Sequence, residues 1–124
     1  MLYERILVGT DGSVTAAAAV ARAVEVAQAT GATLTIVNVG SGRRPAEIVA
    51  AEASRHGAAG VAISSETRTG DPATVLAAMA ADDGYDLLVV GNKGMTGAAR
   101  FLLGSVPNKV SHRASCSLLI VHTT

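Results

Sequence analysis

Apolar residues in this chain form short continuous runs, separated by longer segments in which apolar positions recur at helical spacing. A short apolar run that is bounded by glycine or polar residues is typical of a strand buried on both faces. The runs, together with stretches rich in Val, Ile and Thr, predict strands at residues 6–8, 32–39, 61–68, 86–90 and 118–121.

Helices are expected between these strands, at residues 15–30, 45–56, 72–81 and 107–113. Two of them carry clear local signals. Ser13 suits the N-cap of the first helix, and Gly31 suits its C-terminal cap. Asp71 and Pro72 together mark the start of the third helix, because Asp can cap it and Pro fits its first position. Residues 40–44 are interpreted as a flexible loop before the helix that Pro45 opens.

The regular alternation of strand and helix predicts an α/β fold in a single domain of residues 1–124. Strands of nearly continuous apolar character that are separated by helices indicate a parallel sheet covered on both faces, which is a three-layer α/β/α sandwich. Right-handed crossovers leave few topologies for such a sheet.

Composition narrows the class of protein. Aromatic residues make up 2% of the chain although 49% is hydrophobic, so the core must consist of Val, Ile, Leu and Ala. Ten basic and ten acidic side chains cancel, which gives no electrostatic reason to expect a nucleic acid or a membrane as partner. The single Cys116 excludes an internal disulfide and suits a reducing compartment. No secretory leader or apolar run of about 20 residues is visible, so a cytoplasmic location is expected.

Two turns carry candidate chemistry. In an open α/β sheet, ligands bind beyond the carboxyl ends of the strands. The segment Gly9-Thr10-Asp11-Gly12-Ser13 follows the first strand, and Gly91-Asn92-Lys93-Gly94 follows the fourth. If these two strands are neighbours, the two turns face each other across one crevice.

The second turn begins a larger glycine pattern that indicates a phosphate site. Gly91 and Gly94 are followed, after nine further residues, by Gly104 and Ser105, just before the helix expected at 107–113. Glycines let backbone N–H groups approach an anion closely, and a helix N-terminus also favours phosphate. Taken in isolation, Gly91, Gly94 and Gly104 could each be an ordinary turn glycine.

Asp11 and Val39 suggest how the rest of a nucleotide could be held. Asp11 could accept hydrogen bonds from ribose hydroxyls or hold a divalent cation beside the phosphates, although Asp also commonly stabilises its own turn. Val39, at the end of the second strand, could offer backbone edges to a base. Ser13 is more simply explained as a helix cap.

The spacing Gly-x2-Gly-x9-Gly-Ser, the opening residues 6–13, the strand 86–91 and the ending 118–122 together resemble the ATP-binding type of the universal stress protein family. The resemblance implies a Rossmann-like sheet of strand order 3-2-1-4-5, of the adenine nucleotide alpha hydrolase-like group. It also implies an adenine nucleotide as ligand, with ATP expected first and AMP or cyclic AMP as alternatives, and it allows Mg²⁺ at Asp11 as part of a Mg-nucleotide. The implied binding residues are Gly9, Thr10, Asp11, Ser13, Val39, Gly91, Asn92, Lys93, Gly94, Gly104, Ser105 and Val106.

The expected role is regulation or stress response rather than catalysis. No catalytic group is identifiable from the sequence and no Gly-Lys-Ser/Thr phosphate loop occurs in it, so at most slow hydrolysis of bound ATP is expected. A homodimer is expected through the apolar edge strand Leu118–Val121, because such edges invite pairing with a second copy.

One departure keeps a second hypothesis open. The segment Gly40–Gly60 is shorter than is usual in the family, where a longer loop covers one side of the base. The alternative is a dimeric interaction module whose nucleotide site is vestigial. Arg43 and Arg44, in the shortened segment, are expected to solubilise a loop rather than to bind a ligand. A receiver domain and a flavodoxin are both disfavoured, the first by the lack of a lysine after the last strand and the second by the lack of aromatic residues.

Overall fold

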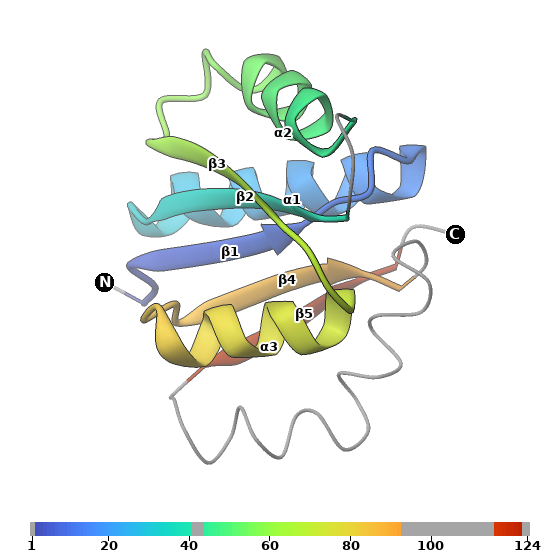
Figure 1. The fold of residues 1–124 in the computed structure, drawn as a ribbon. Coiled ribbons are helices and arrows are strands. Elements are labelled where there is room, and N and C mark those ends of the chain that lie inside the picture. Colours follow the sequence, from blue (N-terminus) through green and yellow to red (C-terminus); the bar gives the residue numbers. More distant parts are fainter. Residues whose placement is uncertain (1, 41–43, 93–115, 123–124) are drawn as a thin grey trace.

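The computed structural model describes residues 2–40, 44–92 and 116–122 (Figure 1). Five parallel strands form one sheet of order β3-β2-β1-β4-β5. Their bounds are β1 Arg5–Gly9, β2 Thr33–Val39, β3 Ile63–Arg68, β4 Leu87–Gly91 and β5 Ser117–Val121. The expected α/β class, the parallel sheet and its strand order are therefore confirmed.

The helices cover both faces of this sheet, which makes the domain a three-layer sandwich. They are α1 Val14–Thr30, α2 Arg44–Arg55 and α3 Pro72–Asp82. Figure 1 shows α1 and α2 on one face and α3 on the other. None of the helices in the described ranges is long and apolar enough to cross a membrane. The helix expected at 107–113 lies outside the described residues.

The predicted helix ends are confirmed where the local signals are strongest. The Ser13 side chain accepts a hydrogen bond from the backbone N–H of Ala16, and Gly31 ends α1 in the left-handed conformation with a φ of 75°. Asp71 caps α3 by accepting from the N–H of Thr74, and Pro72 stands in its first turn. These signals act within four residues of each helix end, so no tertiary contact is needed to produce them.

The core has two parts, one on each face of the sheet. The α1 and α2 side packs small alanines of α1, such as Ala19 and Ala23, against Ile6 and Val8 of β1 and Ile36 of β2. The opposite side packs residues of α3 against the alternate positions of the strands, including Leu7, Val37, Leu88 and Val90. Every central strand is thus apolar on both faces, as the continuous runs in the sequence indicated.

Most predicted boundaries lie within one residue of the observed ones, and two of the differences change an interpretation. The third strand begins at Ile63 rather than at Val61, because Gly60 turns the chain with a φ of 75° and parallel pairing starts where Ile63 lies opposite Leu34. Arg44 is the first residue of α2 rather than part of a loop. The helix starts one residue before Pro45 because a proline fits the first helical turn, where its missing N–H is not needed.

Candidate functional site

The sheet brings the candidate turns to one edge. β1 pairs with β2 on one side and with β4 on the other, and the β1–β4 register aligns Ile6 with Leu87 and Val8 with Val89. Because the strands are parallel, the segments that follow β1, β2 and β4 leave the sheet at the same end. β1 and β4 are therefore neighbours, which is the condition under which the two candidate turns face each other across one crevice.

The turn after β1 is held by its own side chains. Thr10 is fully buried, and its N–H donates to the carbonyl of Val37 over 2.9 Å. The Thr10 hydroxyl accepts from the N–H of Gly12, and one carboxylate oxygen of Asp11 accepts from the N–H of Ser13 over 2.9 Å. Asp11 thus stabilises its own turn, as the simpler interpretation of this residue proposed.

Ser13 acts at the start of α1. Its hydroxyl accepts from the N–H of Ala16 over 3.1 Å and lies 3.1 Å from the hydroxyl of Thr15. Both contacts are local to the first turn of the helix. Ser13 is therefore a helix cap that stands beside the candidate site, which agrees with the simpler interpretation of its sequence position.

Asn38 is a structural contributor to this edge that the sequence interpretation missed. Its side chain is 5% exposed, and its amide nitrogen donates to the carbonyl of Thr10 over 2.7 Å. This bond ties the end of β2 to the turn after β1, across 28 positions of sequence. A signal was present, since a single amide stands between Val37 and Val39 in an otherwise apolar strand end.

Backbone hydrogen bonds between neighbouring strands continue to the ends of β2 and β4, where the candidate residues Val39 and Gly91 lie. Val39 and Gly40 are half-buried, and the N–H of Gly40 donates to the carbonyl of Arg68 over 2.8 Å. Gly91 lies opposite Val121, and the N–H of Asn92 donates to the carbonyl of Val121 over 2.9 Å. The described part of the glycine pattern therefore starts from a fixed position at the sheet edge.

The start of α2 packs directly on two of these turns. A Cβ placed on Gly12 would lie 3.0 Å from Cγ1 of Ile48, and Gly12 has a φ of 83°, which L side chains rarely adopt. A Cβ placed on Gly40 would lie 3.6 Å from Cγ of Pro45. Glycine at position 12 is therefore required both by the backbone conformation and by the close approach of α2.

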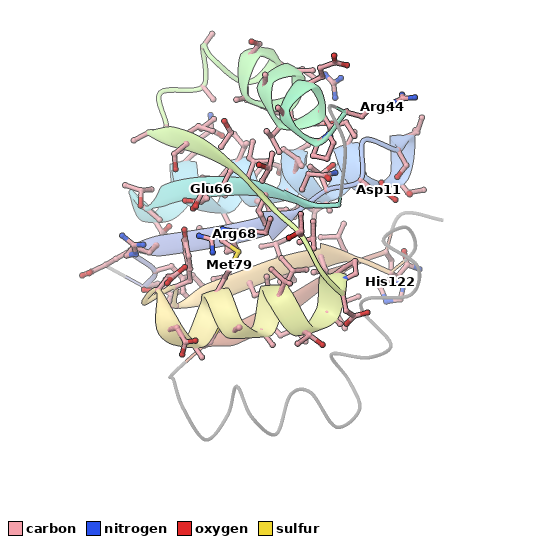
Figure 2. The ribbon with its side chains drawn as sticks, viewed as in Figure 1. Asp11, Arg44, Glu66, Arg68, Met79 and His122 are labelled. Atoms are coloured by element: carbon pink, nitrogen blue, oxygen red, sulfur yellow. The ribbon has the colours of Figure 1, made fainter. Side chains whose placement is uncertain are left out.

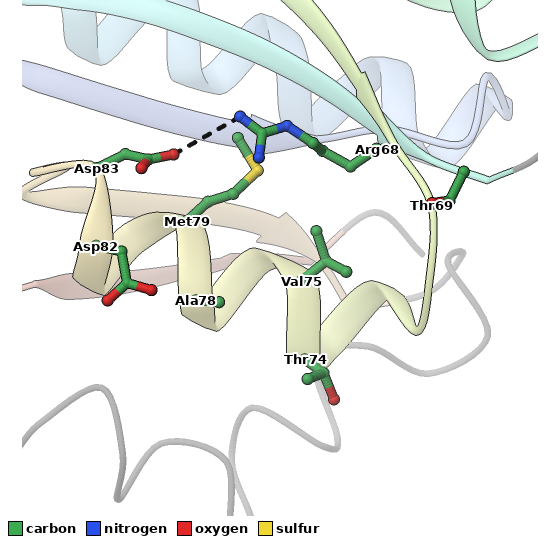
Figure 3. A pocket seen from close by; sticks show the side chains of 8 residues that line it. All are labelled: Arg68, Thr69, Thr74, Val75, Ala78, Met79, Asp82 and Asp83. Atoms are coloured by element: carbon green, nitrogen blue, oxygen red, sulfur yellow. Dashed lines mark ion pairs between the residues drawn. The ribbon is translucent and has the colours of Figure 1, made fainter.

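A separate hollow of about 340 Å³ lies between the end of β3 and α3 (Figure 3). Met79 and Val75 contribute apolar surface, and Arg68 contributes a guanidinium. That guanidinium already pairs with Glu66 at 2.8 Å and with Asp83 at 3.7 Å. The hydrogen bond and charge of Glu66, followed by the charge of Asp83, raise the pKa of Arg68. We do not assign a ligand to this hollow, because its cation is engaged by the protein's own carboxylates.

The remaining predicted site residues fall outside the described ranges. These are Lys93, Gly94, Gly104, Ser105 and Val106. The structure therefore brings together Gly9, Thr10, Asp11, Val39 and Gly91, with Ser13 and Asn92 beside them. Within the residues described, no group of three or more His, Cys, Asp or Glu side chains is arranged to hold a metal ion. A divalent cation at Asp11 would need further ligands from a bound phosphate.

Comparison with known proteins gives consistent matches over nearly the whole chain. The sequence model of the universal stress protein family matches residues 2–54 and 43–122. The universal stress protein Rv1636 of Mycobacterium tuberculosis is 35% identical over 144 residues, and the alignment covers 98% of both chains. That alignment is longer than the 124 residues of this chain, so the relative has residues that this chain lacks.

Solved structures agree with the sequence matches. A universal stress protein crystallised in complex with cAMP superposes with a TM-score of 0.78 at 39% identity, over 98% of both chains. The crystal structure of Rv1636 from Mycobacterium tuberculosis superposes with a TM-score of 0.67 at 41% identity, over 98% of this chain and 97% of that one.

Proposed function

This chain belongs to the universal stress protein family, and from that premise we propose that it binds an adenine nucleotide at the carboxyl edge of its sheet. The observation that carries the proposal is the β1–β4 pairing, which sets the turn Gly9–Ser13 beside the start of the glycine pattern at Gly91. The relative that was crystallised with cAMP supports adenine as the base. ATP is the first expected ligand, with AMP and cyclic AMP as alternatives.

In this proposal each strand end contacts one part of the nucleotide. Backbone N–H groups of Gly91, Gly94 and Gly104 would hold the phosphates, with the Ser105 hydroxyl as a further donor. Asp11 would accept hydrogen bonds from the ribose and would contact any Mg²⁺ that the phosphates bring. The backbone at Val39 would meet the base. We assign binding and a regulatory or stress-response role rather than catalysis, because Asp11, the carboxylate among these groups, already accepts a hydrogen bond from the N–H of Ser13 within its own turn.

Calorimetry with ATP, AMP and cyclic AMP tests the proposal, using the wild-type chain and two loop variants. Gly94→Val should abolish binding, because a branched side chain would block the approach of backbone N–H groups to phosphate. Ser105→Ala should weaken binding by about 1 kcal/mol, the net value of one hydrogen bond. Gly57→Val is the matched control, since Gly57 follows α2 at the other end of the sheet and a Cβ there meets only the Ser54 carbonyl at 3.4 Å. Unchanged affinity in both loop variants would remove the glycine pattern from the site.

A second candidate function is a dimeric interaction module without bound nucleotide. It is favoured by the short connection between β2 and α2, which consists only of residues 40–43. The purified protein distinguishes the two functions. Nucleotide released on denaturation, or a melting temperature that rises with added ATP, supports the first function. Protein that is free of nucleotide and has unchanged stability in ATP supports the second.

We also propose a homodimer through β5. This strand is at the edge of the sheet, and Leu118 is 37% exposed, while Leu119 and Ile120 are half-buried. Pairing with a second copy would cover both the apolar side chains and the backbone edge of β5 that pairs with no other described strand. Sedimentation should show a dimer at micromolar concentration, and Leu118→Lys should shift it toward the monomer. A wild-type monomer under these conditions would contradict the dimer but not nucleotide binding.

A further inference from the structure

Arg44 stands at the candidate site although its sequence position suggested a solvated loop. It is the first residue of α2, and Figure 2 shows it at the same end of the molecule as Asp11. Arg44 and Gly12 line a common hollow of about 190 Å³, whose other lining residues are Glu47, Ile48, Ala51, Glu52 and Arg55 of α2. The arginine thus borders the turn after β1, from the side on which α2 covers the sheet.

The position of Arg44 follows from the short connection before α2. Residues 40–43 alone join β2 to the helix, so α2 begins directly beyond the end of β2. Pro45 approaches Gly40, and Ile48 approaches Gly12. The first turn of α2 therefore lies over the ends of β2 and β1, and the exposed Arg44 is the first residue of that turn.

Arg44 also differs from the other arginines in the described ranges by having no side-chain partner there. The others are engaged: Arg22 pairs with Glu25, Arg55 with Glu52, Arg68 with Glu66 and Asp83, and Arg5 lies over the Tyr85 ring and donates to the Asp83 carbonyl. The Arg44 side chain is exposed. Its guanidinium is free to meet a ligand at this edge without breaking an existing ion pair.

The order of the strands indicates which part of a nucleotide Arg44 would meet. The base is proposed at β2, the ribose at β1 and the phosphates at β4. Adjacent strands lie about 4.8 Å apart, so the ends of β2 and β4 are separated by about 10 Å. The start of α2 packs over the ends of β2 and β1. Arg44, the first residue of α2, is therefore nearer to the proposed position of the base than to that of the phosphates.

We infer that Arg44 stacks its guanidinium on the adenine base and covers the face that a longer β2–α2 loop would otherwise cover. A planar guanidinium stacks well on an unpaired base, whereas a lysine ammonium does not offer a flat surface. The inference rests on the proposed function, because it names a specificity-determining residue of the same site.

The test compares wild type, Arg44→Ala, Arg44→Lys and the control Arg22→Ala with adenosine, AMP and ATP as ligands. Arg22→Ala removes the same side chain and charge from an exposed position in the middle of α1. Arg44→Ala should weaken binding of all three ligands by a similar factor, about two- to fivefold, the size expected for an exposed cation–π contact. Arg44→Lys should not restore the affinity, and Arg22→Ala should bind as wild type. The loss should persist at high salt, because stacking is screened little.

The inference is overturned if wild type binds but Arg44→Ala binds equally well. It is also overturned if the loss is absent for adenosine, grows with the number of phosphates and is restored by lysine, since that pattern identifies an ion pair with phosphate. In both cases nucleotide binding itself stands. If wild type binds none of the three ligands, the proposed function fails and this inference fails with it. Thermal melting of each variant checks that the fold is intact.

Discussion

The two ends of the sheet are built differently. At the amino end, the Asp86 carboxylate accepts from the backbone N–H groups of Glu4 and Arg5, over 2.9 and 3.1 Å. Arg5 in turn donates to the carbonyl of Asp83 and lies over the ring of Tyr85, 4.8 Å from its centre. At the carboxyl end, the side chains of Thr10, Asp11 and Ser13 bond to backbone N–H groups of their own turn.

We expect this difference to separate the residues that determine stability from those that would bind a ligand. At the amino end, side chains connect β1 to the segment before β4, across more than 80 positions of sequence. At the carboxyl end, Asn38 makes the side-chain link between strands, and glycines occupy the turns. We therefore expect substitutions at the amino end to change the free energy of unfolding, and substitutions at the carboxyl end to change ligand affinity as well.

Replacing Asp86 should have the largest effect on the free energy of unfolding. Asp86→Ala should lower the free energy of unfolding by about 2–3 kcal/mol, because two backbone N–H groups lose a charged acceptor. Nucleotide affinity should not change in the protein that remains folded. Urea denaturation measures the first quantity, and calorimetry measures the second. Asp86→Asn, which keeps one acceptor oxygen, should lose less stability. A large loss of affinity in Asp86→Ala would contradict the separation of the two ends.

Replacing Asn38 should change stability less than Asp86→Ala does, but it should also change ligand affinity. Asn38→Leu should lower the free energy of unfolding by about 1–2 kcal/mol, since the buried carbonyl of Thr10 loses its donor. Affinity should fall too, because the turn that carries Asp11 is no longer tied to β2. Thr35→Val is the matched control, because Thr35 is a buried polar residue of the same strand whose hydroxyl lies 3.0 Å from that of Ser64, away from the strand end. If both variants bind nucleotide as wild type, Asn38 has only a structural role.

The smallest expected effect concerns Cys116, at the amino end of β5. Burial, and secondarily the charge of Asp86, raises the pKa of this thiol. A raised pKa means that less thiolate is present at pH 8 in the folded than in the unfolded chain, so alkylation by iodoacetamide should be slower in the folded protein. The same shift stabilises the fold below the pKa of the unfolded thiol, and this contribution is lost as pH rises through the folded value. Asp86→Ala should speed alkylation modestly; equal rates in folded and unfolded protein would contradict the shift.

Features that depend on near neighbours were predictable from the sequence. Ser13, Gly31 and Asp71 act within four residues of the helix ends, and the apolar runs mark strands that are buried on both faces. The class of fold and the turns at the carboxyl edge of the sheet followed from the same patterns. The β1–β4 adjacency did not follow from periodicity; it came from the family resemblance, and the strand order confirms it.

Tertiary structure decided the features that join distant segments. Asn38 reaches Thr10 across 28 positions, and Asp86 reaches Glu4 across 82, so local periodicity cannot identify the partner of either side chain. The same holds for Arg44, which local pattern assigned to a loop. Its place beside the turn after β1 depends on the length of one connection and on how closely Ile48 of α2 approaches Gly12. The sequence alone determined which residues turn, cap and pack, because those choices are local. Only the folded sheet determined which of them meet, because that depends on the order in which the strands lie side by side.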